Sequence, residues 1–378
     1  MKKITLFVIA LVAFVFCSQA QKNYVKHNPT KRNIGYRMAI EPQFADVVVD
    51  FSEGIAGVFM KFGQGVTNID TSGNPISPET YPNVRPFSNG LAAVQKDQKW
   101  GYINKEGKVV IPFEYVLAND FSDGLGLVNI DVFGDDQYYR RAYIDSKGRA
   151  LGAQIKGVAN NFSEGYAAIQ GKDNTWTIIN SKYVATSPRL LFDEIGEFHE
   201  GMARVKLGNN YGFIDTLGKV VIAIQPLALG LRFYEGYCLV MIDGKYGYMD
   251  KFGKIVLPCK YTYAENFSCG RAVVSESTKR SEGSGAIDGG FGVIDHDGNY
   301  VVKPDKFEFI VGPFSDGFAI VGSDEGKVGY IDINGKVMIP MIYEQARPFH
   351  NGFGAVKVDG KWGFLQITDE VYREAYGY

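Results

Sequence analysis

The sequence predicts an all-β fold built from a tandem repeat, and three observations support this. A Phe-x-x-Gly motif recurs along the chain, with clear copies at Phe87, Phe121, Phe162, Phe198, Phe233, Phe267, Phe314 and Phe349 and a weaker copy at Phe51. A second motif, Asp/Asn-x-x-Gly, follows in most copies and is typical of tight turns. Between residues 42 and 366, short apolar runs alternate with turn residues, without helical periodicity.

The spacing of the Phe-x-x-Gly motif sets the expected architecture. Neighbouring copies lie roughly 35 residues apart, which gives about nine units. A unit of this size cannot bury its own apolar face, so it must pack on its neighbours. We expect two or three short strands in each unit and a curved, solenoid-like stack of units. The alternative is a β-propeller, although 35 residues is short for a four-stranded blade.

One unit illustrates the expected strands. Residues 91–95 form a short apolar run suited to a buried strand, residues 101–104 form a second strand, and residues 108–111 form a third. Proline closes the third strand because it has no N–H with which to continue the pairing. This proline recurs at Pro112, Pro258, Pro304 and Pro340.

The Asp/Asn-x-x-Gly motif predicts the hairpin between the second and third strands. An Asp or Asn side chain can bond the backbone two residues on, and Gly accepts the positive φ that closes the turn. The motif starts at Asp70, Asn104, Asp145, Asp215, Asp250, Asp295 and Asp332. The segment from Asp295 to Asn299 also resembles part of a calcium loop, but it lacks the full ligand set and lies at the shared turn register. We therefore interpret it as a turn and expect no metal site.

A third recurrent string identifies a family resemblance. The string is aromatic, Gly, then an apolar pair and Asp or Asn, as in Trp100-Gly-Tyr-Ile-Asn and in the segments that start at Tyr211, Tyr246, Phe291, Val328 and Trp362. It resembles the bacterial WG-repeat family, also called KWG repeats, over residues 42–366. Thr177 and Ala142 replace the glycine in two units. The resemblance implies a repeated β-rich module without one shared activity, so it informs the fold more than the function.

The N-terminal residues predict export. Residues 1–20 read as a signal peptide, with Lys2 and Lys3 before an apolar run and a small-residue cleavage site that ends at Ala20. Cys17 offers a lipoprotein alternative, but large residues precede it. We expect a basic tether at residues 21–40, the repeat domain at residues 41–366 and a C-terminal tail at residues 367–378. The exported protein would reach the periplasm, the outer-membrane surface or the exterior.

Composition and charge narrow the function classes. The chain has 40 Lys and Arg against 42 Asp and Glu, and its formal net charge is −2. Nucleic-acid binding is indicated by an excess of positive charge, so this balance does not predict it. The basic tether is a local exception that could touch an anionic polymer. No later apolar run predicts a transmembrane segment.

The sequence contains no motif that predicts catalysis or a cofactor. Its four histidines, His27, His199, His296 and His350, are scattered, and no nucleophile elbow, phosphate loop or zinc motif is present. We expect no enzyme activity, no cofactor and no metal. Cys238 lies at a small core register, whereas Cys259 and Cys269 could form a disulfide in an oxidising compartment; the sequence leaves that pairing open.

The best candidate for a binding surface is an insertion at residues 131–141. It contains side chains able to grip a partner, namely Asp135, Asp136, Tyr138, Tyr139, Arg140 and Arg141. Insertions in repeat proteins emerge on one face, which is often the binding face. A second insertion, at residues 275–289, is rich in Ser and Gly. We expect a non-catalytic scaffold for a protein partner of the cell envelope or exterior. The alternative is a carbohydrate-binding protein that uses its aromatic residues, including Trp100, Trp176 and Trp362.

Overall fold

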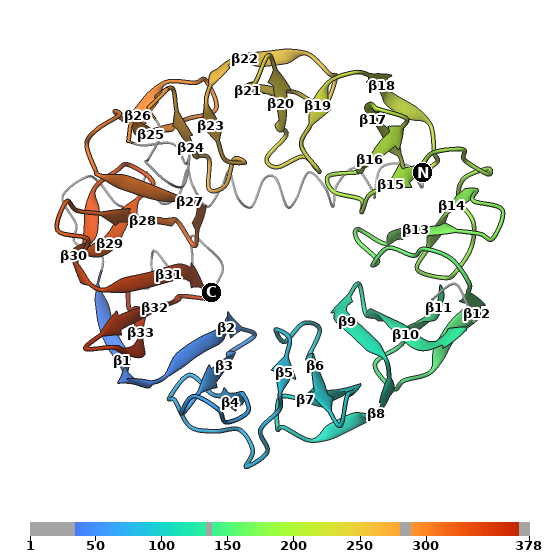
Figure 1. Ribbon diagram of the computed structural model, residues 1–378, viewed down its shortest axis with the longest axis horizontal. Coiled ribbons are helices and arrows are strands. Elements are labelled where there is room, and N and C mark those ends of the chain that lie inside the picture. Colours follow the sequence, from blue (N-terminus) through green and yellow to red (C-terminus); the bar gives the residue numbers. More distant parts are fainter. Residues whose placement is uncertain (1–34, 134–137, 280–288, 370–378) are drawn as a thin grey trace. The chain divides into compact units, whose positions relative to one another are not determined.

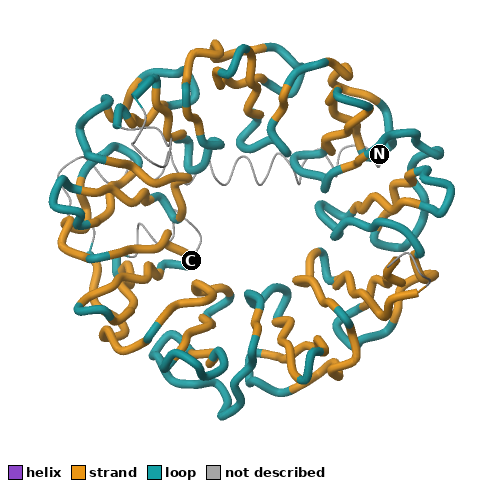
Figure 2. The backbone as a smooth tube through the Cα atoms, in the orientation of Figure 1, coloured by secondary structure: helices purple, strands orange, loops and turns teal. Residues whose placement is uncertain are grey.

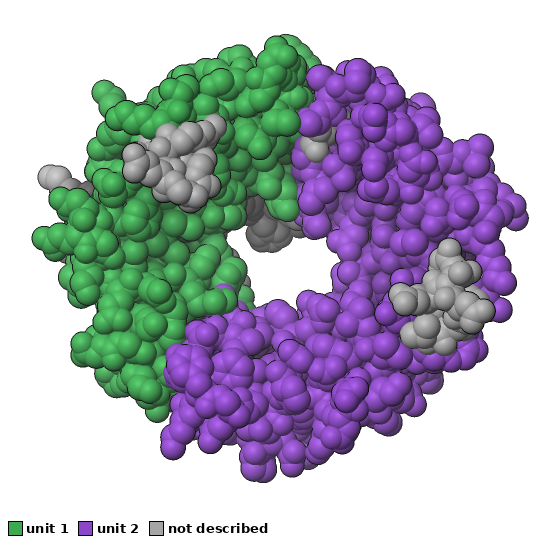
Figure 3. All heavy atoms as spheres, in the orientation of Figure 1, with its two compact units in different colours: residues 1–44, 234–250, 254–378 green, residues 45–233, 251–253 purple. Residues whose placement is uncertain are grey.

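A computed structural model describes residues 35–133, 138–279 and 289–369, and the predicted signal peptide lies outside these ranges. The chain divides into two compact units (Figure 3). Unit 1 contains residues 1–44, 234–250 and 254–378, and unit 2 contains residues 45–233 and 251–253. The regular structure of the described residues consists of strands without any helix (Figure 2). The all-β prediction is therefore confirmed.

Unit 2 contains five antiparallel sheets (Figure 1). Their strands are β2 (Asp46–Ser52), β3 (Ile55–Phe59), β4 (Thr67–Ile69), β5 (Asn83–Val84), β6 (Leu91–Lys96), β7 (Lys99–Asn104), β8 (Val109–Tyr115), β9 (Leu117–Ser122), β10 (Leu125–Phe133), β11 (Tyr138–Ile144), β12 (Ala150–Ile155), β13 (Tyr166–Gln170), β14 (Trp176–Asn180), β15 (Glu194–Ile195), β16 (Met202–Leu207), β17 (Asn210–Asp215) and β18 (Val220–Gln225). The strand orders are β2-β3-β4, β5-β6-β7-β8, β9-β10-β11-β12, β13-β14 and β15-β16-β17-β18. A short strand, β19 (Ala228–Leu229), follows in the same unit.

Unit 1 contains the remaining sheets. Their strands are β1 (Tyr36–Phe44), β20 (Cys238–Ile242), β21 (Lys245–Met249), β22 (Ile255–Tyr261), β23 (Tyr263–Ala264), β24 (Ala272–Ser275), β25 (Phe291–Ile294), β26 (Tyr300–Val302), β27 (Phe309–Ser315), β28 (Phe318–Gly322), β29 (Val328–Asp332), β30 (Val337–Tyr343), β31 (Gln345–His350), β32 (Phe353–Val358) and β33 (Lys361–Ile367). The orders are β20-β21-β22, β23-β24-β25-β26, β27-β28-β29-β30 and β1-β33-β32-β31.

The sheet topology corrects the expected architecture. Most sheets have four strands that follow one another in sequence as an antiparallel meander, which is the organisation of a β-propeller blade. The alternative prediction is therefore the one that the sheets support, and the stack of two- or three-stranded units is wrong. The missed strand is the first of the sheet. In some sheets it is only two residues long, as in β5 and β15, and in β9 the apolar and polar residues do not alternate.

The Phe-x-x-Gly motif is itself a hairpin turn between the first and second strands. Ser88 and Leu91 exchange two backbone hydrogen bonds of 2.9 and 3.2 Å across the two residues between them. These two, Asn89 and Gly90, have φ of 52° and 82°, as a two-residue turn with the right-handed twist of strands requires. The motif therefore begins a four-stranded sheet one strand earlier than the apolar pattern indicates.

The predicted Asp/Asn-x-x-Gly hairpin is confirmed. Asn104 Oδ1 accepts a hydrogen bond of 2.9 Å from the backbone N–H of Lys108, and Gly107 has φ of 72°. The same contact to the residue four positions on occurs at Asp70, Asp145, Asp215, Asp250, Asp295 and Asp332, each at 2.9 Å. The seven turns share one geometry; six of them join the last two strands of a sheet, and the turn at Asp70 follows β4, the last strand of its sheet.

The glycine of the aromatic-Gly string is required by a close approach of the outer strand. The outer strand bulges opposite this glycine, between the pairs Trp100↔Tyr115 and Tyr102↔Ile111. A Cβ atom on Gly101 would lie 2.6 Å from the carbonyl oxygen of Ile111, closer than Cβ atoms come to backbone. Thr177 stands at this register in the sheet of β13 and β14, which has only those two strands.

The first strand of the chain joins the last sheet. β1 pairs with β33 in an antiparallel register that runs from Tyr36↔Ile367 to Phe44↔Trp362. Residues 36–40, which the sequence assigned to a tether, are therefore part of a sheet. The expected C-terminal tail falls almost entirely outside the described residues.

Candidate functional site

The predicted binding insertion forms the end of the β10–β11 hairpin in unit 2. β10 has nine residues and β11 has seven, whereas β6 and β7 have six each at the equivalent place. The two strands pair as far as Phe133↔Tyr138. Asp135 and Asp136 lie outside the described residues, and only the backbone of Tyr138 is described. The insertion thus lengthens a hairpin that belongs to the repeat.

Arg140 is fixed by a carboxylate on the neighbouring strand. Its Nε donates a hydrogen bond of 2.6 Å to Asp131 Oδ1, and its terminal NH2 group contacts Asp131 Oδ2. These hydrogen bonds lower the pKa of Asp131 below its ordinary value. Both side chains are more than one third exposed, at 37% and 39%. The pair therefore presents an oriented guanidinium at the surface.

Arg141 has a different environment from its neighbour. Its guanidinium donates to the carbonyl oxygen of Gly157 and lies over the ring of Tyr139, 5.7 Å from the ring centroid. Burial lowers its pKa below the usual value for arginine. Of the predicted residues, the structure thus brings together Tyr139 and Arg141, whereas Arg140 contacts Asp131 on the neighbouring strand. All three side chains are partly exposed.

A row of polar side chains crosses successive repeats of unit 2, close before the repeat phenylalanines. Asn119 donates to Asn161 Oδ1 at 2.9 Å, and Asn161 donates to Glu197 Oε1 at 2.9 Å. Arg232 lies 3.6 Å from the other oxygen of Glu197. Because these groups satisfy one another, we interpret the row as a link between repeats. Sequence reasoning did not predict it, since its members lie about one repeat apart and vary in residue type.

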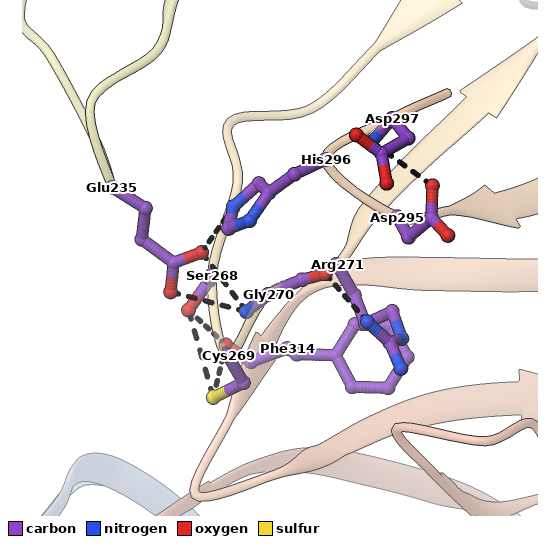
Figure 4. A network of polar contacts seen from close by, with 9 residues as sticks. All are labelled: Glu235, Ser268, Cys269, Gly270, Arg271, Asp295, His296, Asp297 and Phe314. Atoms are coloured by element: carbon purple, nitrogen blue, oxygen red, sulfur yellow. Dashed lines mark hydrogen bonds and ion pairs between the residues drawn. The ribbon is translucent and has the colours of Figure 1, made fainter. Parts of the chain in front are cut away.

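A contact between a histidine ring and a carboxylate lies in unit 1 (Figure 4). His296 Nε2 is 2.9 Å from Glu235 Oε2, and the backbone N–H of Gly270 donates to both oxygens of Glu235, at 2.9 and 3.1 Å. The imidazole stacks on the ring of Tyr237, with 4.8 Å between centroids and 9° between planes. A paired His and Glu can perform acid–base chemistry when a substrate group lies within reach.

Other repeats show what this pair does in the structure. Lysine takes the place of histidine in the pairs Lys105–Glu53, at 3.0 Å, and Lys251–Glu200, at 2.9 Å. The hydroxyl drawn in Figure 4, Ser268 Oγ, donates instead to the carbonyl oxygen of Phe314 at 2.6 Å. A lysine can bridge repeats but does not exchange protons at neutral pH as histidine does. The shared role is therefore to tie a turn to the repeats beside it.

Two further contacts join one repeat to the next through the Phe-x-x-Gly turn. The serine after the phenylalanine donates to the carbonyl oxygen of the next repeat phenylalanine, as in Ser88 to Phe121 at 2.6 Å. The side chain after that serine accepts from the glycine N–H of the next turn, as in Asn89 to Gly124 at 2.7 Å. The serine contact recurs at Ser52, Ser163, Ser268 and Ser315. The recurrence shows that these polar side chains position the repeats.

The remaining candidates from the sequence are the three tryptophans, the cysteines, a metal site and a membrane span. Trp100, Trp176 and Trp362 are at most 9% exposed, so they pack in cores and do not form a stacking surface for sugars. No disulfide joins the described cysteines Cys238, Cys259 and Cys269. Among the described residues, no group of three or more His, Cys, Asp or Glu side chains is arranged to hold a metal. No helix in this part of the chain is long and apolar enough to span a bilayer.

The sequence matches a known repeat over more than half of its length. The family described as "WG containing repeat" matches residues 69–100, 100–131, 190–211, 211–225, 246–277, 291–325 and 329–362. These segments include most of the aromatic-Gly strings and hairpin turns described above. No curated protein shows significant similarity to the whole sequence.

Three solved structures match this chain at low sequence identity. A crystal structure of the eukaryotic initiation factor is 12% identical and has a TM-score of 0.53; the match covers 86% of this chain and 91% of that one. BamB from Moraxella catarrhalis is 10% identical with a TM-score of 0.41, over 75% of this chain and 96% of that one. The C-terminal WD40 domain of Sif2 is 10% identical with a TM-score of 0.37, over 74% and 93%.

Proposed function

This chain belongs to the WG-repeat family, and we propose that it is an exported, non-catalytic scaffold that binds another protein of the cell envelope or exterior. The observation that carries the proposal is the β10–β11 hairpin. It extends a repeat sheet and carries two partly exposed side chains: Arg140, which Asp131 holds in place, and its neighbour in the sequence, Tyr139, whose ring contacts Arg141. Arg and Tyr dominate the binding energy of many protein interfaces, and a fixed side chain loses less entropy on binding.

The arrangement of the repeats supports a scaffold role for the hairpin. Serine and carboxylate contacts tie each turn to the next, so the sheet that carries the hairpin has a fixed position relative to its neighbours within unit 2. Sites on rigid elements hold their geometry better than sites on loops. Export rests on the N-terminal sequence, with Lys2 and Lys3 before an apolar run.

The test is cross-linked capture of envelope proteins on the purified protein, followed by identification and a binding measurement with the purified partner. The double variant Tyr139→Ala/Arg140→Ala should weaken that binding at least tenfold, because two side chains of the hairpin surface are removed. Denaturation of the variant should show a folding transition close to that of the wild type, since both side chains are partly exposed.

The matched control is Arg189→Ala. Arg189 pairs with Asp173 at 2.7 Å, and its side chain is 77% exposed, so it is also an exposed arginine held by an aspartate in unit 2. This variant should bind the partner as the wild type does. Equal binding by the hairpin variant would remove the hairpin from the proposal, and turnover of a substrate in broad profiling would contradict the non-catalytic assignment.

A further inference from the structure

The outer strand of a four-stranded sheet has one free edge, where backbone N–H and C=O groups can pair with another chain. In three sheets a proline occupies the same position in this outer strand. The prolines are Pro112 in β8, Pro258 in β22 and Pro340 in β30. Each follows a residue whose carbonyl oxygen lies close to the glycine of the adjacent strand in the sheet. Proline is tolerated in strands where its missing N–H would face away from the partner. It therefore blocks pairing on the free edge.

β18 has the same register without the proline. A Cβ on Gly212 would lie 2.7 Å from the carbonyl oxygen of Ile222, which places Ile222 at the position of Ile111 in β8. The next residue is Ala223, and alanine keeps its N–H. By the register shared with Pro112, this N–H points to the free edge of β18.

The other outer strands are protected in other ways. β12 also lacks a proline, but the hydroxyl of Tyr183 donates to the carbonyl oxygen of Ala153 at 2.9 Å, and the Tyr183 ring lies against Gly152. β26 is only three residues long, and Pro304 follows it. β1 contains Pro42. Among the four-stranded sheets that the structure describes, β18 thus has neither a proline nor a covering side chain of this kind at its outer edge.

The side chains of β18 also favour pairing. Val220 and Val221 are 42% and 41% exposed, and Ala223 is exposed as well. Residues 220–225 carry no charge. Exposed, apolar and uncharged edge strands without proline are the ones that pair between chains.

We propose that two copies of this chain associate through antiparallel pairing of β18 with β18. A strand that fits this edge must be extended, apolar, uncharged and free of proline, and β18 itself has these properties. Antiparallel self-pairing is a two-fold symmetric contact, in which each copy supplies the same surface. Lys219 lies at one end of the strand, so the lysines of the two copies are at opposite ends of the paired strands and do not repel each other.

Sedimentation equilibrium of the purified protein tests the pairing. The wild type should form a concentration-dependent dimer. Ala223→Pro should raise the dissociation constant at least tenfold, because it removes the N–H and adds a ring at the edge. Its thermal midpoint should stay within a few degrees of the wild type, because β8 accommodates Pro112 at this register.

A second pair of variants tests the edge without a change in the backbone. Val221→Lys places a charge on the β18 edge and should also abolish the dimer. Val110→Lys is the matched control: Val110 is 40% exposed at the same register of β8, where Pro112 already blocks the edge, so this variant should dimerise as the wild type does. A wild type that stays monomeric at several hundred micromolar would overturn the proposal. So would a dimer that survives both Ala223→Pro and Val221→Lys.

Discussion

The carboxylate of Asp316 accepts a hydrogen bond of 2.8 Å from the backbone N–H of Gly352, in the turn of the next repeat. Burial raises the pKa of Asp316 to about 6, and the bond from Gly352 opposes this rise only in part. The contact that joins these repeats therefore uses a carboxylate that is costly to ionise. At neutral pH the folded protein contains the charged form at the expense of stability.

The sign of the pH dependence follows from this raised pKa. A carboxyl whose folded pKa exceeds its unfolded pKa stabilises the fold at low pH, and that contribution is lost as the pH rises from about 4 to about 6. Asp316→Asn removes the ionisation and keeps an acceptor oxygen, as Asn89 does for Gly124 at 2.7 Å. We expect the variant to be about 1–3 kcal/mol more stable than the wild type at pH 8, and equal to it near pH 4.

Urea denaturation of both proteins at the two pH values measures this difference. Asp123→Asn is the matched control, because Asp123 accepts the same kind of bond from Gly165, at 2.7 Å, but is exposed. Its stability at pH 8 should change by less than about 0.5 kcal/mol. A difference between wild type and Asp316→Asn that is the same at both pH values would show that ionisation of Asp316 is not its cause.

Gly101→Ala tests the steric reason for the aromatic-Gly string. The added methyl group would meet the Ile111 carbonyl oxygen at 2.6 Å, so the bulge in β8 must shift. We expect a loss of about 1–3 kcal/mol in the free energy of unfolding, as for other overpacked sites. Thr177→Ala, at the same register in the sheet without an outer strand, should cost less than about 1 kcal/mol. Denaturant titration compares the two, and equal losses would contradict the steric explanation.

Local patterns in the sequence predict much of this fold. The hairpin that begins at Asn104 is encoded in four residues, and the side chain and glycine that form it lie within the turn. First strands such as β5 were missed because they have only two residues. A usable signal was present: Asn89-Gly90 is the dipeptide most typical of two-residue hairpins, and it predicts a strand on each side.

Contacts between distant residues leave no such local signal. The pairing of Tyr36 with Ile367 joins the two ends of the chain, and nothing near Tyr36 in the sequence indicates a partner. The contact between Glu235 and His296 depends on the packing of separate repeats. The sequence shows the insertion that contains Tyr139 and Arg140 because it changes the repeat length, but the contact of Arg141 with the carbonyl oxygen of Gly157 depends on the fold, which brings these residues close.

Tyr102→Phe tests a hydroxyl that joins two sheets. Tyr102 is fully buried, its hydroxyl donates to the carbonyl oxygen of Asn119 at 2.7 Å, and its ring lies 4.9 Å from that of Phe121. Removal of the hydroxyl leaves that carbonyl without this donor, so we expect a loss of about 1 kcal/mol in urea denaturation. Tyr102→Leu also removes the ring contact and should lose about 1–2 kcal/mol more. Phe213 already holds this register without a hydroxyl and keeps the same ring distance of 4.9 Å to Phe233. A larger loss for Tyr102→Phe than for Tyr102→Leu would contradict the assignment of separate contributions to the hydroxyl and the ring.

His296→Lys tests whether the Glu235 pair links repeats through charge. Lysine forms the equivalent pair between Lys251 and Glu200, so this variant should match the wild type in thermal stability at pH 7. His296→Ala removes both the pair and the stacking on Tyr237, and should lose about 0.5–1.5 kcal/mol, because the histidine and glutamate side chains are 34% and 20% exposed. If His296→Lys is as unstable as His296→Ala, the stacked ring and not the ion pair holds this turn in place.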